Sequence, residues 1–508
     1  MRKKLSFILG LLMIFTMSFT SFADVEYAPK EVVYSETQFK ADLEVLKELL
    51  EKNHANLYEN VKKEELDDLF KKSFNEIDSN INAKDFAVIV AKLVAKVGDG
   101  HTYLSDPSYL SSMIEENMTF LPLNVIHIGD SWYNDGLYKY IPVGAKITSI
   151  NNMDMNSVIE KLKCNSGSET NDVNDLAYKM IEMSLSSLYP VYIQEQTTHE
   201  IGFIDPITDE KKTVTINNED INIKALNKYG HSNYLKNCFY NNKTPLSARF
   251  VPEKKTAILK VSTFSPDDLE EFEVFIDKFF EKVEYDGVEN IVYDIRGNLG
   301  GYFSLVDHLL SYINDDQFKT MEYMHMRDLS LYRADLLTES SMEQYQSLMD
   351  DLTTALNDDE ELKTLEEDEN QTVELMSDNS IMFTQKFTDP SEKHVFKGNN
   401  YVLVDEASFS CGSIFPQRVQ KLDNGFVVGT KTSGNFYETT AGYMLNFELP
   451  NTKTLVNIPL AQIVMEDKLI NGIKRQSPVV ADYKIELDYN DYLNSKDTQM
   501  NYLLNMIK

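Results

Sequence analysis

Two short segments, far apart in the chain, carry residues that could perform acyl-transfer chemistry together. Ser410 lies in SFSCGS, where a predicted strand has ended and a predicted helix begins. This placement is typical of a nucleophilic serine, although an isolated serine at a helix start is more often an N-cap. The N–H of Cys411 would point from the helix start toward Ser410, which suits an oxyanion donor. His101, in VGDGHTYL, follows a predicted helix and could accept the serine proton.

A third segment, DIRGNLGG, follows a strand with an apolar run and opens a helix. Its glycines permit close backbone approach, and N–H groups at a helix start attract anions. The loop around Gly300 therefore predicts a phosphate or an oxyanion site, and a purely structural turn is the alternative.

Other chemistries find no support in the sequence. Neither HExxH nor GxxxxGK[ST] occurs, and the eight histidines form no pair at metal-binding spacing. The sequence therefore predicts no metal and no cofactor.

The charge balance excludes several partners. The chain has 508 residues, with 49 basic and 81 acidic side chains and a net charge of −32. Binding to nucleic acid or to anionic lipid requires a cationic face, so neither partner is expected. The acidic surface could favour basic peptides, although a merely solvated surface explains the charge as well.

The N-terminus has the pattern of a secretory signal peptide at residues 1–23. Arg2, Lys3 and Lys4 precede an apolar stretch, and Ser21 and Ala23 provide the small residues of a cleavage site. We therefore expect a secreted protein, extracellular or at the cell surface, without a membrane anchor after cleavage. Three cysteines leave at least one thiol free, and a Cys164–Cys238 disulfide is possible.

The elements that must position these residues fall into three regions. Residues 37–115 show helical periodicity and carry His101, and residues 118–230 show short strands. PVGAKITSINNMDMNSVIEKL resembles the end of a PDZ-type domain. Strands and helices alternate over 245–490, which predicts an α/β catalytic domain. An insertion at 318–396 is expected to be an exposed acidic helical excursion, because residues 336–370 hold 12 acidic residues and one lysine.

In order along the chain, DGHT, DIRGNLGG, SFSCGS and GTKTSGN resemble the C-terminal processing peptidase and tricorn-core family of serine proteases, over roughly residues 37–490. The resemblance implies Ser410 as the nucleophile and Gly300 with Cys411 as the oxyanion hole. Cys411 and Ser413 replace the family's Ala and Glu. Asn435 stands where processing peptidases have their catalytic lysine.

The tricorn-like branch instead uses a histidine, which His101 matches, although Gly100 replaces the serine usual before it. Glu466 is the candidate for the late acid that supports the site, and Asp482 matches a terminal motif with a structural role. Lys431 is the alternative base, and Cys411 is an alternative nucleophile.

The predicted fold is a multidomain α+β protein with an N-terminal helical segment, a PDZ-like β-rich middle and a ClpP/crotonase-like α/β catalytic domain. The predicted function is hydrolysis of peptide bonds in peptide or protein substrates. A catalytically silent peptide-binding member and a hydrolase of small esters or amides remain alternatives. The sequence leaves the oligomeric state open.

Overall fold

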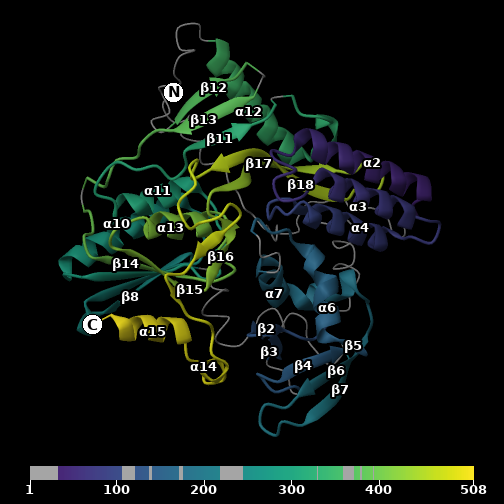
Figure 1. Cartoon of the computed structure of the whole chain (residues 1–508), viewed down its shortest axis with the longest axis horizontal. Coiled ribbons are helices and arrows are strands. Elements are labelled where there is room, and N and C mark those ends of the chain that lie inside the picture. Colours follow the sequence, from purple (N-terminus) through teal and green to yellow (C-terminus); the bar gives the residue numbers. More distant parts are fainter. Residues whose placement is uncertain are drawn as a thin grey trace.

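The computed structural model describes residues 33–105, 120–136, 140–170, 175–217, 244–328, 330–357, 371–377, 380–392 and 394–507. The predicted signal peptide and Cys238 lie outside these residues. The chain is a mixed α+β protein with several sheets, as predicted (Figure 1). No helix in the described part of the chain has the length and apolarity needed to cross a membrane.

The N-terminal region, where the sequence shows helical periodicity, begins with three amphipathic helices: α2 (Glu36–Asn53), α3 (Lys63–Glu76) and α4 (Ala83–Lys96). Helix α2 starts at a capping box, in which Ser35 and Gln38 bond reciprocally. Helix α4 starts at the Asn82 cap and stops before Gly98, which adopts a φ of +74°. The chain then turns through residues 98–102 into β1 (Tyr103–Leu104).

The middle region has its own sheet and its own core. The sheet order is β2-β3-β4-β6-β7, and β5 pairs with β4. Its strands are β2 (Val125–Ile128), β3 (Ser131–Asn134), β4 (Lys146–Ile150), β5 (Met153–Asp154), β6 (Thr198–Ile204) and β7 (Lys211–Asn217). Asn151 and Asn152 both have positive φ, so they form the tight turn between β4 and β5. The helical elements are α6 (Met155–Leu162), η1 (Lys163–Asn165) and α7 (Asp175–Tyr192).

The third region is built on a mainly parallel sheet in the order β20-β15-β14-β10-β9-β8, in which only β8 is antiparallel to its neighbour. Its strands are β8 (Leu246–Val251), β9 (Thr256–Val261), β10 (Asn290–Asp294), β14 (Asn399–Val404), β15 (Gly425–Gly429) and β20 (Tyr483–Lys484). The short element η3 (Pro252–Lys254) joins β8 to β9.

Helices cover both faces of this sheet (Figure 1). One face packs against α10 (Leu269–Tyr285), α11 (Phe303–Ser311) and α13 (Cys411–Gln420), and the other packs against α15 (Thr498–Met506). Burial on both faces explains the continuous apolar runs of β10 and β14. A short helix, α14 (Tyr489–Leu493), instead reaches the middle region, where Tyr492 donates to Asp135.

A second sheet joins the N-terminal region to the catalytic region. Its order is β1-β18-β11-β13-β12, and β17 pairs with β18. The new strands are β11 (Tyr323–Met326), β12 (Gln371–Leu375), β13 (Ile381–Gln385), β17 (Glu438–Glu448) and β18 (Leu455–Val464). A separate pair is formed by β16 (Lys431–Asn435) and β19 (Pro478–Val480).

The insertion at 318–396 is only partly the acidic helical excursion that the sequence predicts. It contains η4 (Ala334–Leu336) and helix α12 (Glu339–Asn357), but β11, β12 and β13 belong to the second sheet. Alternating residues of β11 and β13 enter the main core: Met324, Met326, Ile381 and Phe383. The acidic composition concealed these short period-two patterns.

Candidate active site

Ser410 lies at the turn between the loop after β14 and helix α13. Its backbone has φ 53° and ψ −127°, a conformation that non-glycine residues rarely adopt. Its side chain makes no capping hydrogen bond to α13, and the residue is only 4% exposed. The N-cap alternative therefore lacks the bond that defines a cap, and the strained turn matches the geometry expected of a nucleophilic serine.

The Gly300 loop lies against Ser410, as the sequence predicts. A Cβ at Gly300 would be 2.6 Å from Ser410 Cβ and 3.0 Å from the Cys411 nitrogen, and Gly300 has φ +110°. Only glycine allows this approach. However, the Gly300 N–H donates to Asn298 Oδ1 at 2.8 Å. The Gly300 N–H, which the sequence predicts as an oxyanion donor, is therefore already bonded to a side chain of its own loop.

Cys411 is the first residue of α13. Its N–H has no acceptor among the described residues, as expected for the first turn of a helix. Its thiol is buried and donates to the carbonyl of Gly301 at 3.1 Å. Burial raises the pKa of the Cys411 thiol well above its ordinary value, which argues against a nucleophilic thiolate.

Arg296 anchors the glycine loop rather than facing the site. Its guanidinium is buried and bonds to both carboxylate oxygens of Asp294 and to both of Asp497, at 2.6–2.9 Å. Asp497 also caps α15. The arginine of the DIRGNLGG motif therefore ties the end of β10 to the C-terminal helix through two bidentate pairs.

His101 is fully buried in the turn between α4 and β1. Its ring lies 4.8 Å, between centroids, from the ring of Phe409, the residue before Ser410. A Cβ at Gly100 would lie 2.4 Å from Phe409 Cζ, so the Phe409 ring leaves no room for a larger residue at this position. The carbonyl of His101 accepts from Asn457 Nδ2 on β18 at 2.7 Å. The second sheet therefore holds the histidine loop beside the Ser410 turn.

The carboxylate that meets His101 belongs to Glu169. Glu169 Oε1 lies 2.7 Å from His101 Nδ1 and accepts from Thr439 Oγ1 at 2.8 Å. The predicted acid, Glu466, instead pairs with Lys421. This correction has a topological reason: Glu466 follows the end of β18, whereas Glu169 reaches the site from the loop after η1. Nothing in the surrounding SGSETND segment marks Glu169 as a site residue.

Asp99 supports the same loop from the other side. Asp99 Oδ1 accepts from the His101 N–H at 2.8 Å, and Oδ2 accepts from Thr102 Oγ1 at 2.6 Å and lies 3.0 Å from His54 Nε2. Asp99, Thr102 and His54 are all buried. Asp99 therefore joins the backbone of His101 to the hydroxyl of Thr102 and holds the turn of the DGHT motif in one conformation.

Burial and charge oppose each other in this cluster. Burial alone would lower the pKa of His101, but the charge of Glu169 and the hydrogen bonds that the carboxylates of Asp99 and Glu169 accept from the ring outweigh burial and raise this pKa to about 9. Burial also raises the pKa of Glu169. For Asp99, hydrogen bonds from both histidines outweigh burial and keep its pKa well below its ordinary value.

Donor atoms of Asp99, His101 and Glu169 lie within 4.8 Å of one another, a spacing that could admit a metal ion. These atoms already serve one another, since His101 Nδ1 bonds to Glu169 and the His101 N–H bonds to Asp99. The contacts are those of a histidine oriented for proton transfer, so the cluster needs no ion to explain it.

The remaining sequence candidates have structural partners. Lys431 forms an ion pair with Asp175 at 2.7 Å, which weakens its case as the base. Ser413 Oγ donates to the Ser408 carbonyl and accepts from the Gly434 N–H. Asp482 accepts from the Val427 N–H of β15, which agrees with the structural role predicted for it.

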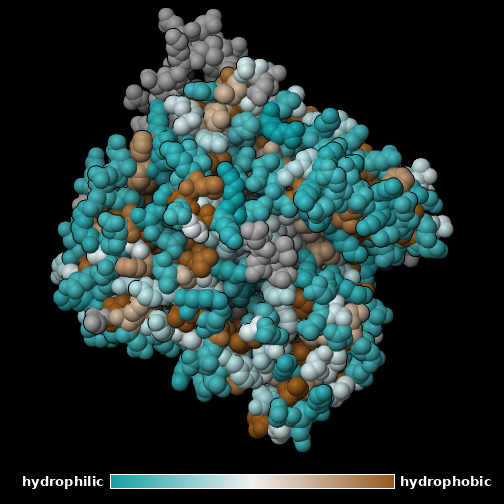
Figure 2. All heavy atoms as spheres, viewed as in Figure 1, coloured by the Kyte–Doolittle hydropathy of each residue, from teal (hydrophilic) through white to brown (hydrophobic). Residues whose placement is uncertain are grey.

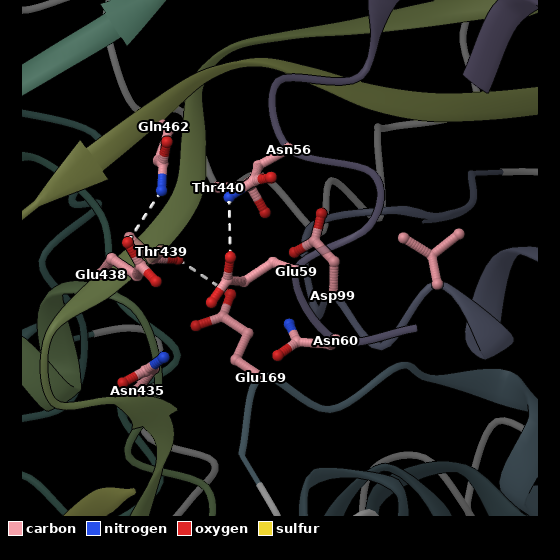
Figure 3. Close-up of a pocket in the computed structure, with 11 residues that line it drawn as sticks. Asn56, Glu59, Asn60, Asp99, Glu169, Asn435, Glu438, Thr439, Thr440 and Gln462 are labelled. Atoms are coloured by element: carbon pink, nitrogen blue, oxygen red, sulfur yellow. Dashed lines mark hydrogen bonds between the residues drawn. The ribbon is translucent and has the colours of Figure 1, made fainter. Parts of the chain in front are cut away.

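A small polar hollow lies beside the cluster (Figure 3). Its lining is mostly polar, and four of the lining side chains are carboxylates: Glu59, Asp99, Glu169 and Glu438. The other lining residues are Asn56, Asn60, Val97, Asn435, Thr439, Thr440 and Gln462.

Comparison with known proteins places this fold in a known family. Residues 255–472 match the sequence model of Peptidase family S41. No curated protein sequence gives a significant match. The solved structure of mature CPAF is 16% identical, with a TM-score of 0.59 over 93% of this chain and 98% of that chain. Mature CPAF complexed with lactacystin is 16% identical, with a TM-score of 0.60 over 93% of this chain and 97% of that chain.

A putative peptidase from Parabacteroides merdae is 13% identical over 94% of this chain and 97% of that chain, with a TM-score of 0.46. The alignment with the two CPAF structures covers 93% of this chain, so the shared fold includes the N-terminal and middle regions as well as residues 255–472. The chain therefore carries a peptidase family S41 domain at residues 255–472 and is, by that membership, a serine peptidase.

Proposed function

We propose that this chain is a secreted serine endopeptidase in which Ser410 is the nucleophile, His101 is the base and Glu169 orients His101. One observation carries the proposal: the Phe409–Ser410–Cys411 turn lies between the Gly300 loop and the His101 loop. These three segments come from regions far apart in the sequence. A purely structural turn at Ser410 would not need a buried histidine–carboxylate pair beside it.

The proposed mechanism follows from the tautomer of His101. Donation of the Nδ1 hydrogen to Glu169 leaves the lone pair on Nε2. That nitrogen takes the Ser410 proton as Oγ attacks the peptide carbonyl, and the resulting imidazolium faces the Glu169 carboxylate. His101 then protonates the leaving amine, and water hydrolyses the acyl-enzyme with His101 again as base.

The developing oxyanion requires N–H donors beside Ser410. The Cys411 N–H at the start of α13 supplies one donor. The Gly300 N–H would supply the second when it exchanges Asn298 Oδ1 for the substrate oxygen. Removal of one such donor is expected to lower kcat about 10²–10³-fold.

Fluorophosphonate labelling tests the proposal directly. The wild-type chain, lacking residues 1–23, is expected to label at Ser410, and Ser410→Ala should not label. His101→Ala should label at least 100-fold more slowly, and Lys431→Ala should label at the wild-type rate. Absence of wild-type labelling would favour the catalytically silent peptide-binding alternative. Labelling that survives His101→Ala but not Lys431→Ala would make Lys431 the base.

Substrate class and location require separate measurements. Cleavage of peptides, with small esters turned over no faster, would support the endopeptidase over the small-ester hydrolase. Lactacystin, which is present in one CPAF structure, is a second probe for the same site.

Export is proposed from the pattern of residues 1–23, and a mature N-terminus at Asp24 would support it. The PDZ-like role of the middle region also stays a proposal.

A further inference from the structure

A second histidine, His54, lies behind the Asp99 carboxylate. Its side chain is fully buried, and its Nε2 lies 3.0 Å from Asp99 Oδ2 and 2.9 Å from Thr102 Oγ1. The backbone N–H of Asn56 donates to His54 Nδ1 at 3.1 Å. Because Nδ1 is an acceptor, the hydrogen of the neutral ring is on Nε2. His54 therefore presents its ring N–H to Asp99 and Thr102.

Backbone contacts fix the direction of this ring. His54 is the C-cap of α2, and its carbonyl accepts from Arg327 Nη1 at 3.3 Å. The N–H of the next residue, Ala55, donates to the carbonyl of Pro459 on β18 at 3.1 Å. The same strand holds the His101 loop through its backbone carbonyl. The two histidine loops are therefore fixed relative to each other by one strand.

Asp99 is a buried carboxylate whose charge depends on its donors. The residue is 2% exposed, its Oδ1 accepts from the His101 N–H, and its Oδ2 accepts from Thr102 Oγ1. Burial favours the protonated acid, but hydrogen bonds from His101 and His54 oppose burial and keep the pKa of Asp99 well below its ordinary value. Removal of a donor from a buried carboxylate leaves its charge poorly stabilised. Of these donors, His54 lies outside the DGHT turn, so it can be replaced without changing that turn.

The Asp99 charge also faces the ring of His101. Asp99 Oδ1 lies 3.7 Å from His101 Nδ1, and Glu169 Oε1 lies 2.7 Å from the same nitrogen. The two carboxylates come from different loops (Figure 3). Negative charge at these distances stabilises the imidazolium that forms when His101 takes a proton. Glu59 and Glu438 line the adjoining hollow and add negative charge to the same surroundings.

We propose that His54 is a positioning residue of the peptidase: its Nε2–H keeps the Asp99 carboxylate ionised, and the Asp99 charge stabilises the His101 imidazolium. This inference rests on the proposed function and adds a residue to its machinery. His54 acts through Asp99 and takes no proton itself, because the Asn56 N–H occupies its Nδ1 lone pair. The alternative is a buried histidine that only caps α2, which would affect folding without changing the proton affinity of His101.

The pH dependence of fluorophosphonate labelling tests this role. In wild type the labelling rate of Ser410 should rise toward a pH of about 9, with a midpoint set by His101. His54→Phe should move this midpoint about one pH unit lower and reduce the limiting rate about tenfold or more, because the imidazolium loses the charge of Asp99. An unchanged midpoint in His54→Phe would overturn the proposal.

A double-mutant cycle with Asp99 shows whether His54 acts through that carboxylate. Asp99→Asn should lower the midpoint as His54→Phe does. Adding His54→Phe to Asp99→Asn should then lower the midpoint no further, because the charge that His54 supports is already absent. Additive shifts in the double variant would contradict the proposed route.

Two matched variants separate electrostatics from packing. His54→Gln, whose amide N–H can replace Nε2–H, should restore the wild-type midpoint. Asp42→Asn removes another fully buried carboxylate, one that accepts from the N–H groups of Asn451 and Thr452, and should leave the midpoint unchanged. A midpoint that falls equally in Asp42→Asn, or that His54→Gln does not restore, would assign the effect to packing and overturn the proposal.

Thermal unfolding of each variant is measured alongside labelling. If His54→Phe does not fold, His54→Asn provides the test, because its shorter side chain neither overpacks the site nor reaches Asp99. The same fall in the midpoint is expected. Loss of the folded state in both variants would assign His54 a structural role and overturn the proposal.

A titration that requires no turnover separates this proposal from the proposed function. The chain has eight histidines, so isotope labelling of the imidazole rings allows His101 to be assigned by NMR from its absence in His101→Ala. The pKa of His101 is then compared in Ser410→Ala with and without His54→Phe. If wild type does not label but this pKa falls with His54→Phe, the coupling of His54 to His101 stands and the peptidase proposal fails. If wild type labels but this pKa is unchanged, only the role of His54 fails.

Discussion

His101 Nδ1 bonds to Glu169, and this contact determines which ring nitrogen can act as a base. Thr439 donates to the same Glu169 oxygen, so the carboxylate is held from two directions. The Asp99 carboxylate also accepts from the backbone N–H of His101 and so holds the loop that carries the ring. The residues around His101 therefore have distinct tasks, which substitutions can separate.

Glu169→Gln is expected to lower kcat/KM by about 10²–10⁴-fold while leaving the fold intact, because the amide can no longer stabilise the imidazolium or fix the tautomer. The rate of fluorophosphonate labelling should fall in parallel. Glu160→Gln, at an exposed position of α6, is the control. Activity within threefold of wild type in Glu169→Gln would remove Glu169 from the mechanism.

The pH profile of the same variant follows from the raised pKa of His101. The neutral base forms as pH rises to about 9, so kcat/KM should increase toward that pH in wild type. In Glu169→Gln the pKa of His101 should fall toward its ordinary value of about 6.5, so the profile should level off at lower pH. Matching profiles for the two proteins would contradict this assignment.

The stability of the folded chain should decrease over the same rise in pH. The pKa of His101 is higher in the folded chain than its ordinary value, so the charged ring stabilises the fold fully below pH of about 6.5. That contribution should be lost as the pH rises through about 9. Thermal unfolding at a series of pH values checks the sign: wild type should lose more stability than Glu169→Gln between pH 6.5 and 9.

At the scale of elements, the site is made where three connections meet. The loop after β10 supplies Gly300, the turn before α13 supplies Ser410, and the turn between α4 and β1 supplies His101. β10 and β14 are adjacent parallel strands, so the loops at their carboxyl ends lie together. The Arg296 pairs to Asp294 and Asp497 then hold the first of these loops in place.

Gly300→Ala should inactivate the protein, because the new methyl group would overlap Ser410 and approach the Cys411 nitrogen. We expect at least a 100-fold slower fluorophosphonate labelling rate and a loss of about 1–3 kcal/mol in stability from the strained backbone. Gly287→Ala is the matched control, since Gly287 has φ +62° with no atom within 4 Å of the added carbon. It should lose about 1–2 kcal/mol and label normally. Equal labelling of the two variants would show that the approach at Gly300 is not needed.

At the scale of the whole molecule, the N-terminal and catalytic regions share one sheet. Tyr103 and Leu104 of β1 pair with Asn457 and Val456 of β18, and helix α2 lies over β18 (Figure 1). The histidine and the serine are thus in one packed body rather than on two loosely joined domains. The face shown in Figure 2 is largely hydrophilic, consistent with the net charge of −32.

This charge should attract basic peptides over long distances. Raising NaCl from about 50 to 500 mM should lower kcat/KM for a lysine peptide about three- to tenfold, because the Debye length shortens from about 14 to 4 Å. A norleucine peptide without charge should change less than twofold. Equal salt dependence for the two peptides would exclude long-range attraction.

Glycine spacing and the order of short motifs along the chain are visible in the sequence, and they identified the family and the mixed α+β class. The same motifs predicted Ser410, the Gly300 loop and His101 as site residues. Helix caps such as Ser35 and Asn82 act within four residues, so the N-terminal helices were equally predictable.

Only the tertiary structure showed which groups meet. The partner of His101 is Glu169, 68 residues away on an unremarkable loop, and the predicted Glu466 pairs with Lys421 instead. The Gly300 N–H bonds to Asn298, and the acidic insertion supplies strands to the second sheet. The polar hollow likewise combines residues from five separate stretches of the chain. Such contacts depend on how distant segments pack, and no local period or motif encodes them.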